Sequence, residues 1–177
     1  MVITAAGVKS KVSEASEMIV TCLSRGDRVY TFGCGGQMAN AMHFAAELSG
    51  KYEQYEDSYP CICLGTNVVE LTAITNDFGW DTVFERLIRA QARPGDIVVG
   101  FSVSGHADYY GAAVDAALGQ RAGFISIVGA DGRGFGGQKV LTIKGQWSST
   151  PEHQEEQLRI IHEICHEVKK ELSLREV

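Results

Sequence analysis

A serine-containing loop follows an apolar run near the middle of the chain. Residues 97–101 form a short β-branched run that stops at Ser102-Val103-Ser104-Gly105, and a helix-like segment begins directly afterwards. Glycine lets the backbone approach a ligand closely, and a helix N-terminus offers unpaired N–H groups. The serine hydroxyls can donate further hydrogen bonds to phosphate oxygens. This pattern is typical of an anion site, but a serine in the same place could also act only as the N-cap of the next helix.

A second loop of this kind occurs earlier in the chain. Residues 27–32 are predicted to form a strand, which ends in Gly33-Cys34-Gly35-Gly36-Gln37 before helical periodicity resumes. In an open parallel sheet, ligands bind at the carboxyl ends of the strands. We therefore expect the two loops to face one pocket.

His43 and Glu47 lie four residues apart on the predicted helix after the glycine loop, so their side chains share one face. An imidazole and a carboxylate on one face can ligate a divalent metal ion or transfer protons. A lone histidine on such a helix is more often structural, and the spacing alone leaves both interpretations open.

The last predicted helix carries Gln154, His162 and His166. The segment HEICH, which begins at His162, matches the H-E-x-x-H pattern of zinc proteases. Such proteases need a third ligand, typically further along the chain, and no histidine follows His166. We therefore interpret the match as the chance placement of two histidines on a helix.

Short apolar runs alternate with amphipathic stretches along the chain. Strands are predicted over residues 27–32, 60–64, 97–101, 123–128 and 140–143, and helices over residues 4–24, 37–52, 68–75, 80–91, 107–118 and 152–172. The alternation predicts right-handed βαβ crossovers, and hence an α/β fold in the form of a three-layer α/β/α sandwich with a five-stranded parallel sheet. Residues 76–79 are predicted to form a turn, and residues 129–138 a glycine-rich surface loop.

Length and composition indicate one domain over residues 1–177, with 45% hydrophobic and 21% charged residues. The formal net charge of −6 and the lack of a basic cluster argue against nucleic acid as a partner. No apolar run is long enough for a membrane span and no signal-peptide core is present, so we expect a cytoplasmic protein. The odd number of cysteines, mostly in apolar segments, predicts reduced thiols.

Taken together, these segments resemble the sugar isomerase (SIS) domain, and more closely the bacterial phosphoheptose isomerases. The most specific match lies in the stretch AMHFAAELSG, which begins at Ala41. The first glycine loop, the stretch NDFG beginning at Asn76 and the stretch GDIVVGFSVSG beginning at Gly95 complete the pattern. The resemblance runs from about residue 27 to residue 168, and it implies a flavodoxin-like SIS fold.

The resemblance implies an aldose-ketose isomerase that converts sedoheptulose 7-phosphate to D-glycero-D-manno-heptose 7-phosphate through an enediol. It implies Glu47 and His162 as the catalytic pair. In zinc-containing relatives the ligands correspond to His43, Glu47, Gln154 and His162, so one zinc ion per subunit is implied. A homotetramer with sites shared between subunits is implied as well. The residues expected to bind substrate are Cys34, Gly35, Gly36, Gln37, Lys51, Asn76, Asp77, Ser102, Val103, Ser104, Gly105 and Gln154.

Both loops of this chain depart from the usual pattern of that family. The departing positions are Cys34, Gln37, Lys51, Val103, His106 and Ala107. Fewer hydroxyls mean fewer hydrogen bonds to phosphate and sugar, each worth about 0.5 to 1.5 kcal/mol. The alternatives are therefore an isomerase of a different phosphosugar, or a non-catalytic SIS protein that binds a sugar phosphate or a partner protein. The presence of both Glu47 and His162 favours an enzyme.

Overall fold

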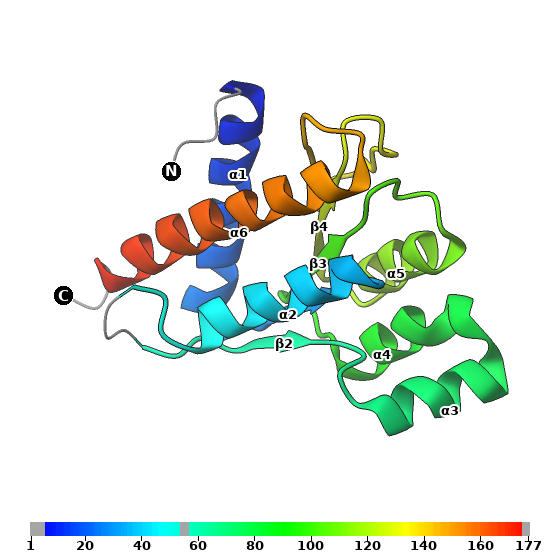
Figure 1. Cartoon of the computed structure of the whole chain (residues 1–177). Helices are drawn as coiled ribbons and strands as arrows, with labels where there is room; N and C mark the ends of the chain where they lie inside the picture. Colours follow the sequence, from blue (N-terminus) through cyan, green and yellow to red (C-terminus); the bar gives the residue numbers. More distant parts are fainter. Residues whose placement is uncertain (1–5, 54–56, 175–177) are drawn as a thin grey trace.

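The computed structural model describes residues 6–53 and 57–174, which form one parallel sheet with helices on both faces (Figure 1). The strands are β1 (Val29–Phe32), β2 (Cys61–Cys63), β3 (Ile97–Phe101), β4 (Gly123–Val128) and β5 (Val140–Lys144). Their order is β2-β1-β3-β4-β5, and every neighbouring pair is parallel. The predicted five-stranded parallel sheet is confirmed.

The helices cover the two faces of the sheet. On one face lie α1 (Ala6–Ser24), α2 (Gly36–Ser49) and α6 (Thr150–Ser173). On the other face lie α4 (Val83–Gln91) and α5 (Asp108–Gly119), with α3 (Val68–Phe78) and the short 3-10 helix η1 (Trp80–Thr82) beside α4. The predicted three-layer sandwich is therefore confirmed, although residues 4 and 5 of the first predicted helix lie outside the described residues.

The core is divided in two by the alternation of side chains along the strands. On β3, Val99 and Phe101 face α1, α2 and α6, whereas Val98 faces α4 and α5. Every residue of β3 is buried, as expected for a parallel strand covered on both sides. A continuous apolar run such as residues 97–101 therefore predicts a central strand well.

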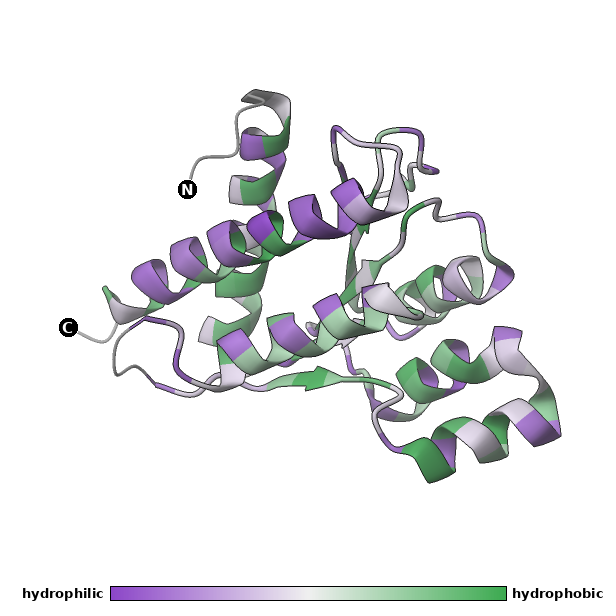
Figure 2. Ribbon diagram, in the orientation of Figure 1, coloured by the Kyte–Doolittle hydropathy of each residue, from purple (hydrophilic) through white to green (hydrophobic). Residues whose placement is uncertain are grey.

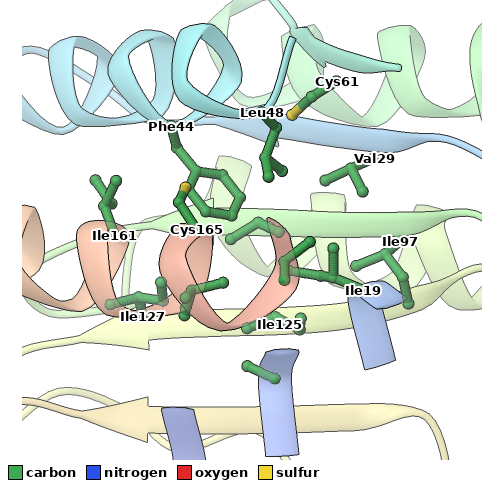
Figure 3. Packing of buried hydrophobic residues seen from close by; sticks show 14 of the residues in the cluster. Ile19, Val29, Phe44, Leu48, Cys61, Ile97, Ile125, Ile127, Ile161 and Cys165 are labelled. Carbon is green, nitrogen blue, oxygen red and sulfur yellow. The ribbon is translucent and has the colours of Figure 1, made fainter. Parts of the chain in front are cut away.

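An apolar layer beneath α2 and α6 places these two helices against the sheet. The rings of Phe44 on α2 and Phe101 on β3 pack edge to face, with centroids 6.0 Å apart. Ile161 and Cys165 of α6 are fully buried in the same layer (Figure 3). Hydrophilic residues lie along the outer side of α6 (Figure 2). This amphipathic packing fixes which faces of α2 and α6 remain available for chemistry.

Several boundaries differ from the sequence prediction: the helix predicted over residues 37–52 ends at residue 49, and most strands and helices differ by one or two residues at an end. Helix α3 continues to Phe78, so Asn76 and Asp77 form its last turn instead of a separate turn, and Gly79 ends the helix at φ 87°. A positive φ of this kind favours glycine. Residues 80–91 divide into η1 and α4. Helix α6 begins at residue 150, two residues earlier than predicted, because Pro151 fits the first turn of a helix.

Two further expectations concern cysteines and membranes. The five cysteines form no disulfide, in agreement with the prediction of reduced thiols. Among the helices of residues 6–53 and 57–174, none has the length and apolar character needed to cross a bilayer.

We expect Asp96→Ala to lower the free energy of unfolding by about 2 to 4 kcal/mol, because it leaves two backbone donors without an acceptor. The buried Asp96 carboxylate accepts hydrogen bonds from the backbone N–H groups of Arg28 (2.8 Å) and Arg93 (2.7 Å). Urea denaturation measures the change. Asp115→Ala on the exposed side of α5 is the control. An equal, small effect of both substitutions would show that these bonds contribute little.

Candidate active site

Helices α2 and α6 lie side by side and run in the same direction (Figure 1). Near their N-termini, Asn40 Nδ2 donates to the backbone oxygen of Gln154 at 3.2 Å. Near their C-termini, Lys169 Nζ donates to the backbone oxygen of Gly50 at 2.8 Å. Both N-termini, with their unpaired N–H groups and positive dipole ends, therefore lie at the edge of the sheet where β1 and β3 end.

His43, Glu47 and His162 form one cluster across these two helices. His43 Nε2 lies 3.2 Å from Glu47 Oε1, one turn further along α2, and 3.1 Å from His162 Nε2 on α6. The ligand atoms of all three residues lie within 4.8 Å of one another. The side chains of His43 and Glu47 are 40% and 18% exposed, so the cluster is accessible to a ligand.

The cluster fits a divalent metal ion. In a tetrahedral site with zinc–nitrogen bonds of 2.0 to 2.1 Å, two ligand atoms lie about 3.3 Å apart. The separations of His43 Nε2 from its two neighbours, 3.1 and 3.2 Å, are close to that value. Two imidazole nitrogens and one carboxylate oxygen are also a donor set that zinc accepts with a further position left open. The same three groups could exchange protons when no metal is bound.

Gln154 lies near the N-terminal end of α6, where its side-chain amide approaches the first glycine loop. A Cβ atom added to Gly36 would overlap the side-chain amide of Gln154, so this approach of α6 to the first loop requires glycine at position 36. Eight residues of helix separate Gln154 from His162, which corresponds to about 12 Å along the axis. A role for Gln154 as a metal ligand therefore stays a prediction.

The serine loop follows β3 as predicted. Ser102 Oγ accepts a hydrogen bond from Gly105 N at 2.9 Å, and Ser104 Oγ accepts one from His106 N at 3.3 Å. The N-cap of α5 is Ala107 and it provides no side-chain cap, so Ser104 is not the N-cap. Because both hydroxyls accept in these bonds, their hydrogens remain available for a ligand.

The first glycine loop leads directly into α2. Gly35 is the N-cap of that helix at φ 60°, and Cys34 is exposed beside it. Gln37 is only 5% exposed, and within the described part of the chain neither Nε2 nor Oε1 of its amide has a hydrogen-bond partner. Burial, and to a smaller extent the neighbouring Cys34, raise the pKa of nearby Tyr109 to about 12. Tyr109 therefore remains a neutral hydrogen-bond donor at physiological pH.

Three predicted substrate-binding residues lie at the C-terminal ends of α2 and α3. Lys51 follows the C-terminal end of α2, whose 14 residues span about 21 Å from the glycine loop. Asn76 and Asp77 are exposed in the last turn of α3, where Asn76 Nδ2 donates to Asp77 Oδ1 at 2.8 Å. Helix α3 packs on η1 and α4. Substrate contacts by these residues therefore stay predictions.

His166 does not join His162 in the metal-binding cluster. It lies one turn further along α6 and is exposed, with its Nδ1 4.0 Å from Glu53 Oε2. The Tyr52 ring centroid lies 6.0 Å from that of His162 and 6.4 Å from that of His166. In the part of the chain that the structure describes, the HEICH segment thus contributes one histidine to the cluster, which agrees with the rejection of the zinc-protease interpretation.

A buried polar group near the start of α6 was missed by the sequence analysis. His153, Glu156 and Gln157 are all buried, on the side of the helix that carries Ile160 and Ile164 one and two turns later. The sequence could have indicated them, because these polar residues fall on the helix face that carries the apolar residues. Polar side chains on a buried face need polar partners inside the protein.

Comparison with known proteins identifies the fold family. Residues 4–129 match the SIS domain, which is more than half of the chain. The chain belongs to the SIS domain family. This SIS domain protein is 35% identical over 157 residues to the phosphoheptose isomerase of Alteromonas mediterranea, covering 87% of this chain and 79% of that protein. It is 34% identical over 164 residues to the phosphoheptose isomerase of Geobacter sp. strain M21, covering 93% of this chain and 85% of that protein.

Solved structures agree with these relationships. The phosphoheptose isomerase of Neisseria gonorrhoeae matches the SIS domain protein with a TM-score of 0.83 and 31% identity, covering 90% of this chain and 86% of that one. The phosphoheptose isomerase of Francisella tularensis matches with a TM-score of 0.86 over 91% and 86% of the two chains, and at 23% identity it supports the fold alone. The resemblance to phosphosugar isomerases of the SIS family is confirmed.

We expect His43→Ala and His162→Ala each to weaken Zn²⁺ binding by about 100-fold, because each removes one of three ligands that lie close together. Isothermal titration of chelator-treated protein with Zn²⁺ measures the affinity. His166→Ala, one turn from His162 and exposed, is the matched control and should leave the affinity unchanged. Similar affinities in all three variants would show that the metal binds elsewhere.

Proposed function

We propose that this protein is an aldose-ketose isomerase that converts sedoheptulose 7-phosphate to D-glycero-D-manno-heptose 7-phosphate. The observation that carries the proposal is the cluster of His43, Glu47 and His162 beside two loops suited to a phosphate group. Identities of 34 to 35% to phosphoheptose isomerases over about nine-tenths of the chain support the same substrate.

The distance between the loops and the cluster supports a long sugar phosphate. His43 is seven residues beyond Gly36 on α2, which is about 10 Å along the helix axis. An extended seven-carbon sugar phosphate has a comparable length. With its phosphate at the helix N-termini and the serine loop, its carbonyl end would reach the cluster.

Without a bound metal ion, Glu47 and a protonated His162 would carry the proton transfers. Glu47 removes a proton from C1 of the ketose, and the electron pair forms the C1–C2 double bond while the C2 carbonyl oxygen takes a proton from His162. The enediol then accepts a proton at C2 from Glu47 and returns its C1 hydroxyl proton to His162, which yields the aldehyde. Both groups end in their starting protonation states, so the cycle balances.

The same cluster accounts for the expected zinc ion. His43, Glu47 and His162 would hold it, with Gln154 added by the resemblance to zinc-containing relatives. When bound, the ion would polarise the C2 carbonyl and stabilise the negative charge of the enediolate. Glu47 has two carboxylate oxygens, of which Oε1 lies beside His43 Nε2, so the other can serve as the base.

We also propose a homotetramer with sites shared between subunits, as the resemblance implies. The exposed positions of Lys51, Asn76 and Asp77 within a single chain support sharing. Val68 and Val69 on α3 are exposed apolar residues, which are typical of a surface covered by another protein.

We expect Glu47→Gln to lower kcat by about 10²- to 10⁴-fold, the contribution typical of a general base. NMR detection of sedoheptulose 7-phosphate conversion, with and without added Zn²⁺, measures it. Glu155→Gln on the exposed side of α6 is the control. Unchanged turnover in the folded Glu47 variant would refute the acid/base assignment.

The wild-type protein in that assay also separates the alternatives. Conversion of another phosphosugar in place of sedoheptulose 7-phosphate would indicate a different isomerase. Binding of sugar phosphates without conversion of any would indicate a non-catalytic SIS protein.

We expect Ser104→Ala to raise the KM for sedoheptulose 7-phosphate by about tenfold, since a hydrogen bond to a charged group is worth about 1.5 kcal/mol or more. Steady-state kinetics measure KM and kcat separately. Ser173→Ala, at the exposed C-terminal end of α6, should leave both values unchanged. A KM equal to that of the wild-type protein would remove the main support for the phosphate loop.

A further inference from the structure

The backbone of the serine loop is held from behind by side chains of α6. The carbonyl oxygen of Ser102 lies 3.1 Å from His153 Nε2 and accepts a hydrogen bond from Gln157 Nε2 at 3.2 Å. Gln157 Nε2 also donates to the carbonyl oxygen of Ile127 in β4, at 3.3 Å. Both α6 side chains are fully buried. Two residues of one helix thus bind the carboxyl ends of two neighbouring strands.

The orientation of the Gln157 amide is fixed from α2. Asn40 Nδ2 donates to Gln157 Oε1 at 2.9 Å and to the backbone oxygen of Gln154 at 3.2 Å. Because a backbone oxygen can only accept, the Asn40 amide nitrogen must face these two acceptors. Gln157 Oε1 is therefore occupied, and its Nε2 is left to face the two strand-end carbonyls. Gln157 Nε2 also lies 2.9 Å from His153 Nε2. A His153 tautomer protonated at Nε2 donates to the Ser102 carbonyl, whereas one protonated at Nδ1 accepts from the Gln157 amide and so supports the residue that holds the carbonyl.

Glu156 extends the same contact region to a third strand. Its two carboxylate oxygens accept from the backbone N–H of Gln146, at 2.9 and 2.8 Å, just after β5. Its Oε2 lies 3.7 Å from His153 Nδ1. A Cβ atom at Gly145 would overlap the Glu156 carboxylate and lie 3.0 Å from His153 Nδ1, so the close approach requires glycine there. The start of α6 therefore contacts the ends of β3, β4 and β5.

The loop carbonyls determine where the loop N–H groups point. The carbonyl oxygen of Val103 accepts from Gly129 N at 2.8 Å, and that of Ser104 accepts from Arg133 N at 2.7 Å. In a planar trans peptide, the N–H of one residue points opposite to the carbonyl of the residue before it. With the Ser102 and Val103 carbonyls held from behind, the N–H groups of Val103 and Ser104 are directed to the opposite side of the loop.

We propose that His153 and Gln157 are positioning residues for the anion site. By holding the Ser102 carbonyl, they direct the N–H of Val103 toward a bound phosphate group and fix the serine loop to the helix that carries His162. The proposal rests on the proposed function for the identity of the sugar phosphate, whereas the effect on the anion site can be measured with inorganic phosphate alone.

The test compares His153→Leu and Gln157→Leu with the wild-type protein. We expect each to raise the Kd for inorganic phosphate and the KM for sedoheptulose 7-phosphate by about fivefold, because one hydrogen bond to the loop is lost. The value of kcat should stay within about threefold, because the cluster of His43, Glu47 and His162 is left intact. Isothermal titration and steady-state kinetics supply the three quantities.

Two variants control for a purely structural effect. His153→Gln keeps an N–H donor of similar reach and should restore most of the phosphate affinity. Glu155→Gln, exposed on the same turn of α6, should leave every value unchanged.

Asn40→Ala, at a half-buried position, releases the Gln157 amide and should raise the phosphate Kd about twofold. If the leucine variants do not fold, the phosphate Kd of Asn40→Ala tests the proposal in their place, and an unchanged Kd would contradict it.

Several outcomes would overturn the proposal. If His153→Leu and Gln157→Leu lower the Tm but leave the phosphate Kd and the KM unchanged, the two residues have only a structural role. Wild-type protein that binds no inorganic phosphate would remove the anion site and the proposal with it. Wild-type protein that binds phosphate but converts no sedoheptulose 7-phosphate would refute the proposed function alone, because the phosphate titrations of the variants would still decide this inference.

Discussion

The contact between α2 and α6, packed side by side in the same direction, is the interaction on which the rest of the structure depends. It places the two helix N-termini at one edge of the sheet, and it sets His43 opposite His162 at 3.1 Å. Phe44 and Ile161 hold the helices in this register from below. A shift of one helix by a single turn, about 5.4 Å, would separate the two imidazoles. Packing therefore provides the stability, and the register of the packing determines the chemistry.

Close approach of α6 to the sheet edge depends on two glycines. Gly36 makes room for the amide of Gln154, and Gly145 makes room for the carboxylate of Glu156. Both glycines lie at or just beyond the end of a loop or strand, where a polar side chain of α6 meets the backbone. The Gln154 amide, which approaches the first glycine loop, and the side chains that hold the serine-loop backbone thus come from the same two turns of one helix.

Much of the fold follows from local pattern, but the site does so only in part. Buried strands such as residues 123–128 are apolar throughout, and the structure has β4 at the predicted bounds. The shared face of His43 and Glu47 follows from helical spacing. Their meeting with His162, which lies 119 residues beyond His43, came from the family resemblance, because local spacing contains no information on such long-range contacts. The roles of His153 and Gln157 were missed because their partners are backbone carbonyls, which the sequence does not distinguish from any others.

The fixed carbonyls of the serine loop have a consequence for the thermodynamics of binding. Ordering one residue of a flexible loop costs about 1 to 2 kcal/mol in conformational entropy. Here the carbonyls of Ser102, Val103 and Ser104 are already hydrogen-bonded within the protein, so this cost is incurred during folding. An anion bound at the proposed site would meet a preorganised loop, and its contacts would contribute to affinity without being offset by ordering of the backbone.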